Sequence, residues 1–174
     1  MLAAEARGMR RLAVVSDTHV PSRKSEIPGF IEQELEDADV VVHAGDFDSE
    51  AAYETVESLA GGDLVAVRGN MDPVSLGLPA VETLWVEDRQ FVVVHGSGPL
   101  SGYENRVLQA VREERNDEAA IGIAGHTHEL TDETVDGVRL LNPGSATGAE
   151  PAEEATMLTV DVDGSDVDVS VVRA

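Results

Sequence analysis

The sequence predicts an α/β protein built as a four-layer α/β/β/α sandwich with two mixed β-sheets. The first half of the chain alternates short β-branched runs with segments of helical spacing, the order that forms a parallel sheet with right-handed crossovers. The second half contains three pairs of β-type runs joined by short polar turns, which predict antiparallel hairpins. One small open sheet does not hold so many strands, so two sheets packed between helices are favoured.

Each predicted element follows from a local pattern. Ile31 and Leu35 lie at helical spacing, Ser49 is placed to cap the second helix, and Gly61–Gly62 ends it. Asp136-Gly137 and Asp163-Gly164-Ser165 are hairpin turns. In order, the prediction is a strand at 12–16, a helix at 27–38, a strand at 40–42, a helix at 49–59, strands at 64–67, 83–86 and 91–94 with a turn at 87–90 between the last two, a helix at 104–114, and strands at 120–124, 133–135, 138–141, 156–162 and 167–172.

The length of 174 residues corresponds to about one domain. Because the first strand begins just after Met9, residues 9–174 are expected to form a single domain and residues 1–8 a disordered N-terminal extension. The absence of cysteine excludes disulfides, thiolate metal sites and cysteine nucleophiles. No apolar run approaches the roughly 18 residues that span a bilayer, and no signal-peptide core is present, so a cytoplasmic protein is expected.

The net charge of −22 comes from 34 acidic residues against 12 basic ones, with Lys24 as the only lysine. Such a surface repels nucleic acid and anionic membranes, and neither is expected as a partner. Adaptation to high salt, as in extreme halophiles, is the favoured interpretation, and an acidic face that docks a basic partner is the alternative. Association into a homo-oligomer stays open.

Five polar clusters come directly after apolar runs of the chain. In α/β sheets ligands bind at the carboxyl ends of the strands, so the clusters are expected to meet at one rim. Four of the five histidines fall within them, and this conjunction, rather than any single cluster, predicts a metal site. The clusters are Asp17-Thr18-His19, Gly45-Asp46, Gly69-Asn70, His95-Gly96 and Gly125-His126-Thr127-His128.

The residue types in these clusters suit divalent ions. Carboxylate, imidazole and amide oxygen ligands without sulfur favour Mn, Fe, Co, Ni or Zn. Asp17 and His19 are two residues apart in a segment expected to be extended, so both would reach one ion, and His126 and His128 share that spacing. The glycines before three of the clusters let the backbone turn sharply. A carboxylate such as Asp46 can bridge two ions that lie about 3.5–4 Å apart.

The motifs Asp17-x-His19, Gly45-Asp46, Gly69-Asn70-x-Asp72, His95-Gly96 and Gly125-His126-x-His128 resemble those of the calcineurin-like metallophosphoesterase superfamily. Within it the chain is most similar to the small single-domain phosphodiesterases of bacteria and archaea. The resemblance keeps motif order and spacing from about residue 12 to residue 145. The fold of this family is the four-layer sandwich that the pattern of elements favours.

The resemblance implies a role for each motif residue. A hydroxide that bridges two ions would attack phosphorus in a small phosphate ester, in line with the leaving oxygen. Manganese is the expected metal, with Ni, Co, Fe or Zn as alternatives. Asp46, Asn70 and His126 would act in catalysis. The first ion would be held by Asp17, His19, Asp46 and His128, and the second by Asp46, Asn70, His95 and His126.

Met71 departs from the family pattern. Many members have a histidine after the Gly-Asn pair, placed to assist the leaving group, and a thioether cannot donate a proton. The small phosphodiesterase branch also lacks that histidine. Four further residues are expected around the site or the substrate: His43, Asp72, Asn142 and Ser145. For Asp72 a turn or cap before Pro73 is an equal alternative, and a plain turn competes for Asn142 and Ser145.

The function expected from the sequence is a dinuclear metal-dependent phosphodiesterase. A phosphomonoesterase, such as a nucleotide phosphatase, is the nearest alternative. A nuclease is disfavoured by the acidic surface. The alternative outside the enzymes is a protein-interaction scaffold like the retromer subunit of the same fold, whose metal ligands are degraded. Here every ligand position is filled, which favours catalysis.

Overall fold

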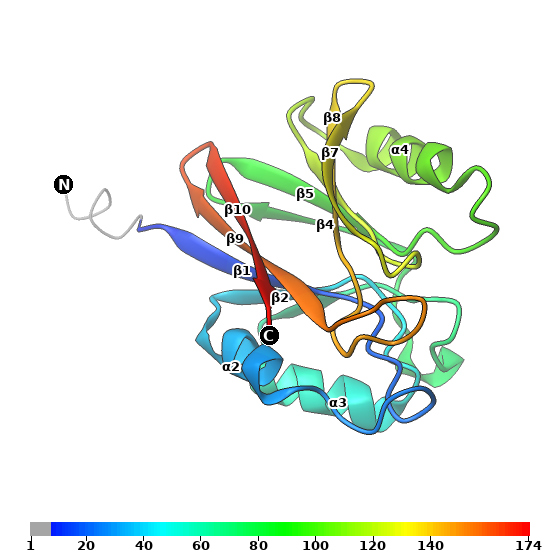
Figure 1. Cartoon of the computed structure of the whole chain (residues 1–174). Coiled ribbons are helices and arrows are strands. Elements are labelled where there is room, and N and C mark those ends of the chain that lie inside the picture. The colour runs from blue at the N-terminus through cyan, green and yellow to red at the C-terminus, as the bar shows by residue number, and fades with distance from the viewer. Residues whose placement is uncertain (1–7) are drawn as a thin grey trace.

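The structure is a computed structural model that describes residues 8–174. Two mixed five-stranded sheets lie face to face, and helices cover their outer faces, giving the layers α/β/β/α (Figure 1). The predicted fold class is confirmed. Of the predicted N-terminal extension, residues 1–7 lie outside the described residues, so its disorder stays a prediction.

The first sheet has the strand order β10-β9-β1-β2-β3. Its three N-terminal strands are parallel, and the C-terminal hairpin adds to β1 in antiparallel register. Ser49 caps the second helix as predicted, because its Oγ accepts a hydrogen bond from the Ala52 N–H at 3.0 Å. The elements are β1 (Arg10–Val15), α2 (Gly29–Asp37), β2 (Val40–His43), α3 (Glu50–Leu59), β3 (Leu64–Ala66), β9 (Thr156–Asp163) and β10 (Asp166–Arg173).

The second sheet has the strand order β4-β5-β6-β8-β7, with parallel pairs at its centre and antiparallel pairs at its edges. The turn between β4 and β5 comprises only Glu87 and Asp88, so the predicted turn at 87–90 was too long. No helix in the described part of the chain has the length and apolar composition to cross a membrane. The elements are η1 (Val74–Leu76), β4 (Val81–Val86), β5 (Arg89–Val94), α4 (Tyr103–Glu114), β6 (Ile121–Ile123), β7 (Leu130–Val135) and β8 (Val138–Pro143).

Strand β1 shows how the layers are held together. Its side chains alternate between two faces, as the strand period requires. Leu12 and Val14 pack between the sheets, while Ala13 and Val15 pack against α2 and α3. From Leu12 to Val15 both faces of the strand are buried, which explains why this part of its sequence is continuously apolar. In the second sheet Val92 of β5 faces α4 in the same way.

The two sheets place their parallel strands so that the five polar clusters lie at one edge. Asp17 follows β1, Asp46 follows β2 and Asn70 follows β3. From the second sheet, His95 follows β5 directly and the Gly125–His128 loop follows β6. The packed sheets therefore carry both halves of the predicted site to the same place.

Candidate metal centre

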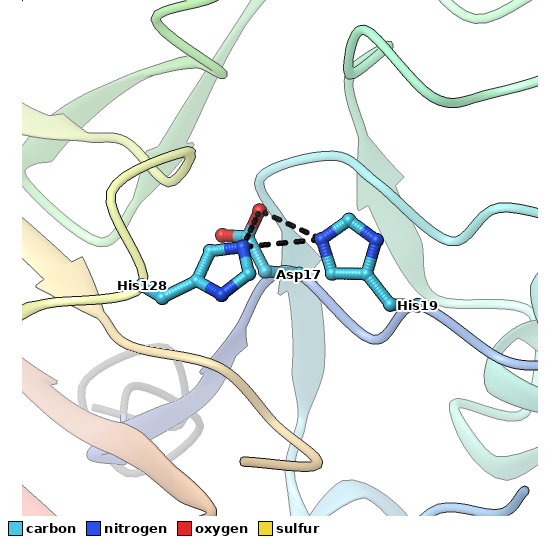
Figure 2. A group of neighbouring side chains, drawn as sticks. All are labelled: Asp17, His19 and His128. Atoms are coloured by element: carbon cyan, nitrogen blue, oxygen red, sulfur yellow. Dashed lines mark hydrogen bonds and ion pairs between the residues drawn. The ribbon is translucent and has the colours of Figure 1, made fainter. Parts of the chain in front are cut away.

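The structure brings the predicted metal-ligating side chains together at this edge. Two groups of three predicted ligands have ligand atoms that all lie within 4.8 Å of one another. The first group consists of Asp17, His19 and His128, and Figure 2 shows these three side chains converging from two loops. The second group consists of Asp46, His95 and His126.

In the first group the distances are those of side chains that face a common point. His19 Nε2 lies 3.1 Å from His128 Nε2. Asp17 Oδ1 lies 3.3 Å from His128 Nε2 and 3.7 Å from His19 Nε2 (Figure 2). All three side chains are buried.

In the second group His95 Nε2 has two close oxygen neighbours. It lies 3.1 Å from Asp46 Oδ2 and 3.1 Å from Asn70 Oδ1. Asp46 Oδ2 also lies 3.7 Å from His19 Nε2, in the first group. Asp46 therefore faces both groups, as a carboxylate that bridges two ions must.

Each of the four histidines uses one ring nitrogen for a hydrogen bond that points away from the centre. Because a carbonyl or carboxylate oxygen accepts, such a bond places a proton on the outer ring nitrogen, and in the neutral ring the other nitrogen keeps its lone pair. The outer partners are Asp48 for His19 Nδ1 at 2.9 Å, the Ala44 carbonyl for His95 Nδ1 at 2.7 Å, the Ala149 carbonyl for His128 Nδ1 at 2.8 Å, and the Gly98 carbonyl for His126 Nε2 at 2.7 Å.

The atoms that face the centre are consequently acceptors. Asp17 Oδ1 is buried and has no hydrogen-bond partner among residues 8–174, while Asp17 Oδ2 accepts from Ser16 Oγ and the His126 N–H. A buried carboxylate oxygen without a donor costs free energy unless a cation neutralises it. The donor set of imidazole nitrogen, carboxylate and amide oxygen fits borderline divalent ions.

The pKa values of the site report the same electrostatics. Burial raises the pKa of Asp17, but contacts with His128, His19 and His95 outweigh burial and leave this pKa well below its usual range. Burial lowers the pKa of His19, but the carboxylates of Asp17 and Asp48 outweigh it and raise the value to about 9. The centre thus favours positive charge, which divalent cations would supply in place of protons.

The backbone of the site is unusual. Eight described non-glycine residues have positive φ, and six of them belong to the site loops: Asp17, His19, Asp46, Asp48, His126 and His128. The φ angles of Asp17 and His19 are 53° and 49°, so the prediction of an extended segment there was wrong, as it was for His126 and His128. The side chains converge because left-handed residues turn the chain, an arrangement that costs about 1–3 kcal/mol for each such residue.

The glycines beside the ligands are required by close packing between loops. A Cβ on Gly45 would lie 2.7 Å from His95 Nδ1 and 2.8 Å from the Gly69 nitrogen. A Cβ on Gly69 would clash with Asp46, and one on Gly125 would clash with Ser16. These glycines let neighbouring loops approach one another, which refines the predicted reason for their presence.

Asp72 holds the loop that carries Asp46. Its two carboxylate oxygens accept four backbone N–H bonds of 2.7–3.0 Å, from Asp46, Phe47, Asp48 and Gly69. Pro73 caps the short η1 helix, so Asp72 is not the cap residue, but it does close the predicted turn, because its N–H donates to the Gly69 carbonyl at 3.4 Å. Its role is to position the backbone between two ligands.

His43 lies outside the two groups. It is fully buried and stacked on Phe47 with ring centroids 3.5 Å apart. Its Nδ1 accepts from the Gly45 N–H at 3.0 Å, and its Nε2 lies 2.8 Å from Thr18 Oγ1. Burial lowers its pKa to about 3, so the ring is neutral and supports the Gly45–Asp46 turn.

Ser145 and Asn142 support the loops of the first group. Ser145 Oγ donates to the Asp17 carbonyl at 2.7 Å. Asn142 Nδ2 donates to the Gly125 carbonyl at 3.1 Å and to Thr127 Oγ1 at 3.0 Å, between His126 and His128. Both residues therefore position ligand-bearing backbone.

Two residues that act on the ligands escaped the sequence analysis. Asp48 accepts a hydrogen bond from His19, and its place two residues after Asp46 in a polar cluster was a usable signal. The Tyr103 hydroxyl donates to the Gly125 carbonyl at 2.7 Å, and burial raises the pKa of this phenol. Nothing in the local sequence of Tyr103 indicates that contact.

A four-layer sandwich that gathers carboxylates and histidines at the carboxyl edge of both sheets has the architecture of a metallophosphoesterase. The chain belongs to the calcineurin-like phosphoesterase superfamily, whose domain model matches residues 10–165. The family resemblance read from the motifs is therefore confirmed.

Three similar proteins place the chain within this family. A probable metallophosphoesterase of Methanothermobacter thermautotrophicus is 31% identical over 163 residues, covering 93% of this chain and 91% of the relative. A phosphodiesterase of Methanocaldococcus jannaschii is 27% identical, covering 79% of this chain and 85% of that protein. The crystal structure of wild-type Vps29 from Entamoeba histolytica complexed with Zn²⁺ has a TM-score of 0.75 and 26% identity, covering 94% and 98% of the two chains.

Because Asp72 accepts four backbone N–H bonds, we expect Asp72→Asn to destabilise the protein and to weaken metal binding. The new amide NH₂ would face two backbone N–H donors, so we expect a loss of about 3 kcal/mol in the free energy of unfolding. Metal affinity should fall by about 10–100-fold, the usual effect of losing an outer support. Urea unfolding of the metal-free protein and calorimetric titration with Mn²⁺ measure the two effects.

The matched control is Asp132→Asn, which changes an exposed carboxylate paired with Arg139 at 2.9 Å. An exposed ion pair contributes about 0–1 kcal/mol, so this variant should differ little from the wild type in both measurements. Equal losses in the two variants would contradict the role given to Asp72.

The buried His43 predicts a loss of stability in acid. Its pKa is about 3 in the folded protein against 6.5 in the unfolded chain, so the unfolded state binds more protons between these pH values. The free energy of unfolding should therefore fall as the pH drops from 6.5 toward 3, and His43→Gln should flatten this slope. Urea unfolding of metal-free protein at pH 6.5, 5.5 and 4.5 measures it.

Ile31→Val is the control for His43, because it removes one buried methyl group from a core cluster and changes no titratable group. It should lower stability by the same amount at each pH. A His43→Gln variant with the unchanged acid slope of the wild type would refute the assignment.

Proposed function

We propose that this protein is a dinuclear metal-dependent phosphodiesterase. The proposal depends on the position of Asp46 between the two groups of predicted ligands. Its Oδ2 lies 3.1 Å from His95 Nε2 in one group and 3.7 Å from His19 Nε2 in the other. The similarity to a phosphodiesterase of Methanocaldococcus jannaschii supports the reaction class. The Zn²⁺ in the similar Vps29 structure supports a divalent metal in such a fold.

The proposed ligand sets follow the two groups. Asp17, His19, Asp46 and His128 would hold one ion, and Asp46, Asn70, His95 and His126 the other, with manganese as the proposed metal. When bound, a pair of divalent ions lowers the pKa of a water molecule and neutralises negative charge on the phosphoryl group. Asp46, Asn70 and His126 are the proposed catalytic residues.

Residues around the proposed ligands orient the ligand side chains and hold their backbone. Asp48 and three backbone carbonyls hold the imidazoles so that their other ring nitrogens face the proposed ion positions. Asp72 and Ser145 hold the backbone of Asp46 and Asp17. Because these supports are already in place, the site needs little reorganisation during the reaction.

The alternative of a non-catalytic protein-interaction scaffold is disfavoured by the free energy that it costs to form this site. A surface that only docked another protein would have no need of a buried carboxylate oxygen without a donor, nor of six strained ligand-loop residues. Adaptation to high salt remains part of the proposal and is supported by the charge of −22.

Metal-dependent hydrolysis is the direct test. Protein loaded with Mn²⁺ should hydrolyse bis(4-nitrophenyl) phosphate, and chelation should abolish the activity. Asp46→Asn should lower kcat/KM by more than about 100-fold, since losing even an outer support costs about 10–100-fold. Asp166→Asn, an exposed change at the start of β10, is the matched control and should keep full activity. Folded, metal-loaded protein that hydrolyses no diester would refute the proposal, and hydrolysis of monoesters alone would favour the phosphomonoesterase.

Met71 predicts a strong dependence on the leaving group. Its side chain is 47% exposed and cannot donate a proton, so kcat/KM should fall steeply as the pKa of the leaving alcohol rises. Proton donation by a positioned histidine contributes about 10²–10⁴-fold, so Met71→His should raise activity on alkyl esters more than on nitrophenyl esters. Met71→Gln is the control of similar length. Rates independent of the leaving-group pKa would contradict the prediction.

A further inference from the structure

A pocket of about 550 Å³ opens beside the metal centre. Asn70 and His95, both proposed ligands, belong to its lining, so the pocket is continuous with the site that would hold the phosphoryl group. Val81 and Val94 contribute apolar walls. Its size lies within the range of about 300–1,000 Å³ typical of small-molecule sites.

The charge of this pocket is opposite to that of the chain. Two arginines, Arg68 and Arg106, line it, in a protein with a net charge of −22. The single carboxylate among its described lining residues is Asp72, whose oxygens are already occupied by four backbone N–H groups. The pocket is therefore a locally cationic cavity.

Arg106 is held in place without being neutralised. Its guanidinium donates to the carbonyls of Pro99 at 2.7 Å, Gly96 at 3.1 Å and Ser101 at 3.3 Å, and none of these acceptors carries a charge. Its Nε is a buried donor without an acceptor among residues 8–174. The positive charge is thus uncompensated by any carboxylate within the described chain.

Arg68 is exposed, and within the described residues its side chain makes no hydrogen bond or ion pair. It lies two positions before Asn70, on the segment that leads from β3 into the site. A free guanidinium at this place can turn toward a bound anion, which it recognises with a planar fork of donors.

We propose that the Arg68–Arg106 pocket binds a second anionic group, a phosphate or a carboxylate, on the organic arm of the substrate. The proposal rests on the proposed function, because it takes the phosphoryl group to lie at the metal centre. The substrate class is then a phosphodiester in which an apolar spacer separates the scissile phosphate from another negative charge. The valines provide the surface for that spacer.

The proposal predicts whether an additional negative charge on a ligand strengthens or weakens its binding. Without a cationic pocket, a chain of net charge −22 would bind a ligand with an additional negative charge more weakly than its neutral counterpart. The proposed pocket predicts the opposite preference. A pair of stable phosphonates that differ only at the far end of the arm isolates this contribution.

The experiment measures binding of 6-phosphonohexanoate and 6-phosphonohexanamide to Mn²⁺-loaded protein by calorimetry at one fixed salt concentration. We expect the carboxylate to bind about tenfold more tightly, as a charge-assisted hydrogen bond allows. Hexane-1,6-diphosphonate shows which anion is preferred, and tighter binding of either anion than of the amide supports the proposal. Arg68→Gln should remove most of the preference.

Arg10→Gln is the matched control, because it removes the same charge at the opposite end of β1 from Asp17. It should keep the preference of the wild type. Equal affinities for acid and amide, no binding of either, or an equal loss of preference in both arginine variants would overturn the proposal. Binding with the expected preference, but without hydrolysis of any diester, would refute the proposed reaction and leave the anion pocket standing.

Discussion

The structure depends on a cluster of carboxylate oxygens and imidazole nitrogens that is held together at one edge of the fold. Neighbouring atoms among Asp17 Oδ1, Asp46 Oδ2 and the inward ring nitrogens of His19, His95 and His128 lie 3.1–3.9 Å apart. Such atoms repel unless a proton or a cation lies among them, so the site binds positive charge strongly. The surrounding contacts serve to keep these atoms in place.

The fold resists this repulsion with rigid supports. Left-handed backbone at the ligands aims the side chains, and its cost is offset where the loops are tied to buried structure. Asp72 ties the Asp46 loop to Gly69, and Ser145 ties Asp17 to the chain after β8. Three clusters of buried apolar side chains lie behind these loops. Their packing stabilises the fold and offsets the free-energy cost of the strained loops at the site.

Charge acts on two length scales in this protein. The net charge of −22 repels anions at a distance, and salt screens this repulsion beyond about 10 Å at 0.1 M ionic strength. Close to the site the local groups determine the potential, because the pair Arg68 and Arg106 is cationic and the proposed metal ions would be as well. An acidic protein can therefore bind a phosphate ester, provided that its recognition is short-ranged.

The sequence by itself determined the fold class, most element positions, the family and the convergence of five polar clusters, because apolar runs and strand ends are local features. It did not determine how the ligands turn inward: the positive φ of Asp17 and His19 replaces the extended segment expected there. Nor did it assign Asp72, whose partners lie up to 26 residues away, or the contact of Tyr103 with Gly125. These features arise only when loops from different strands pack together, since their energies depend on distances between segments that are remote in the chain.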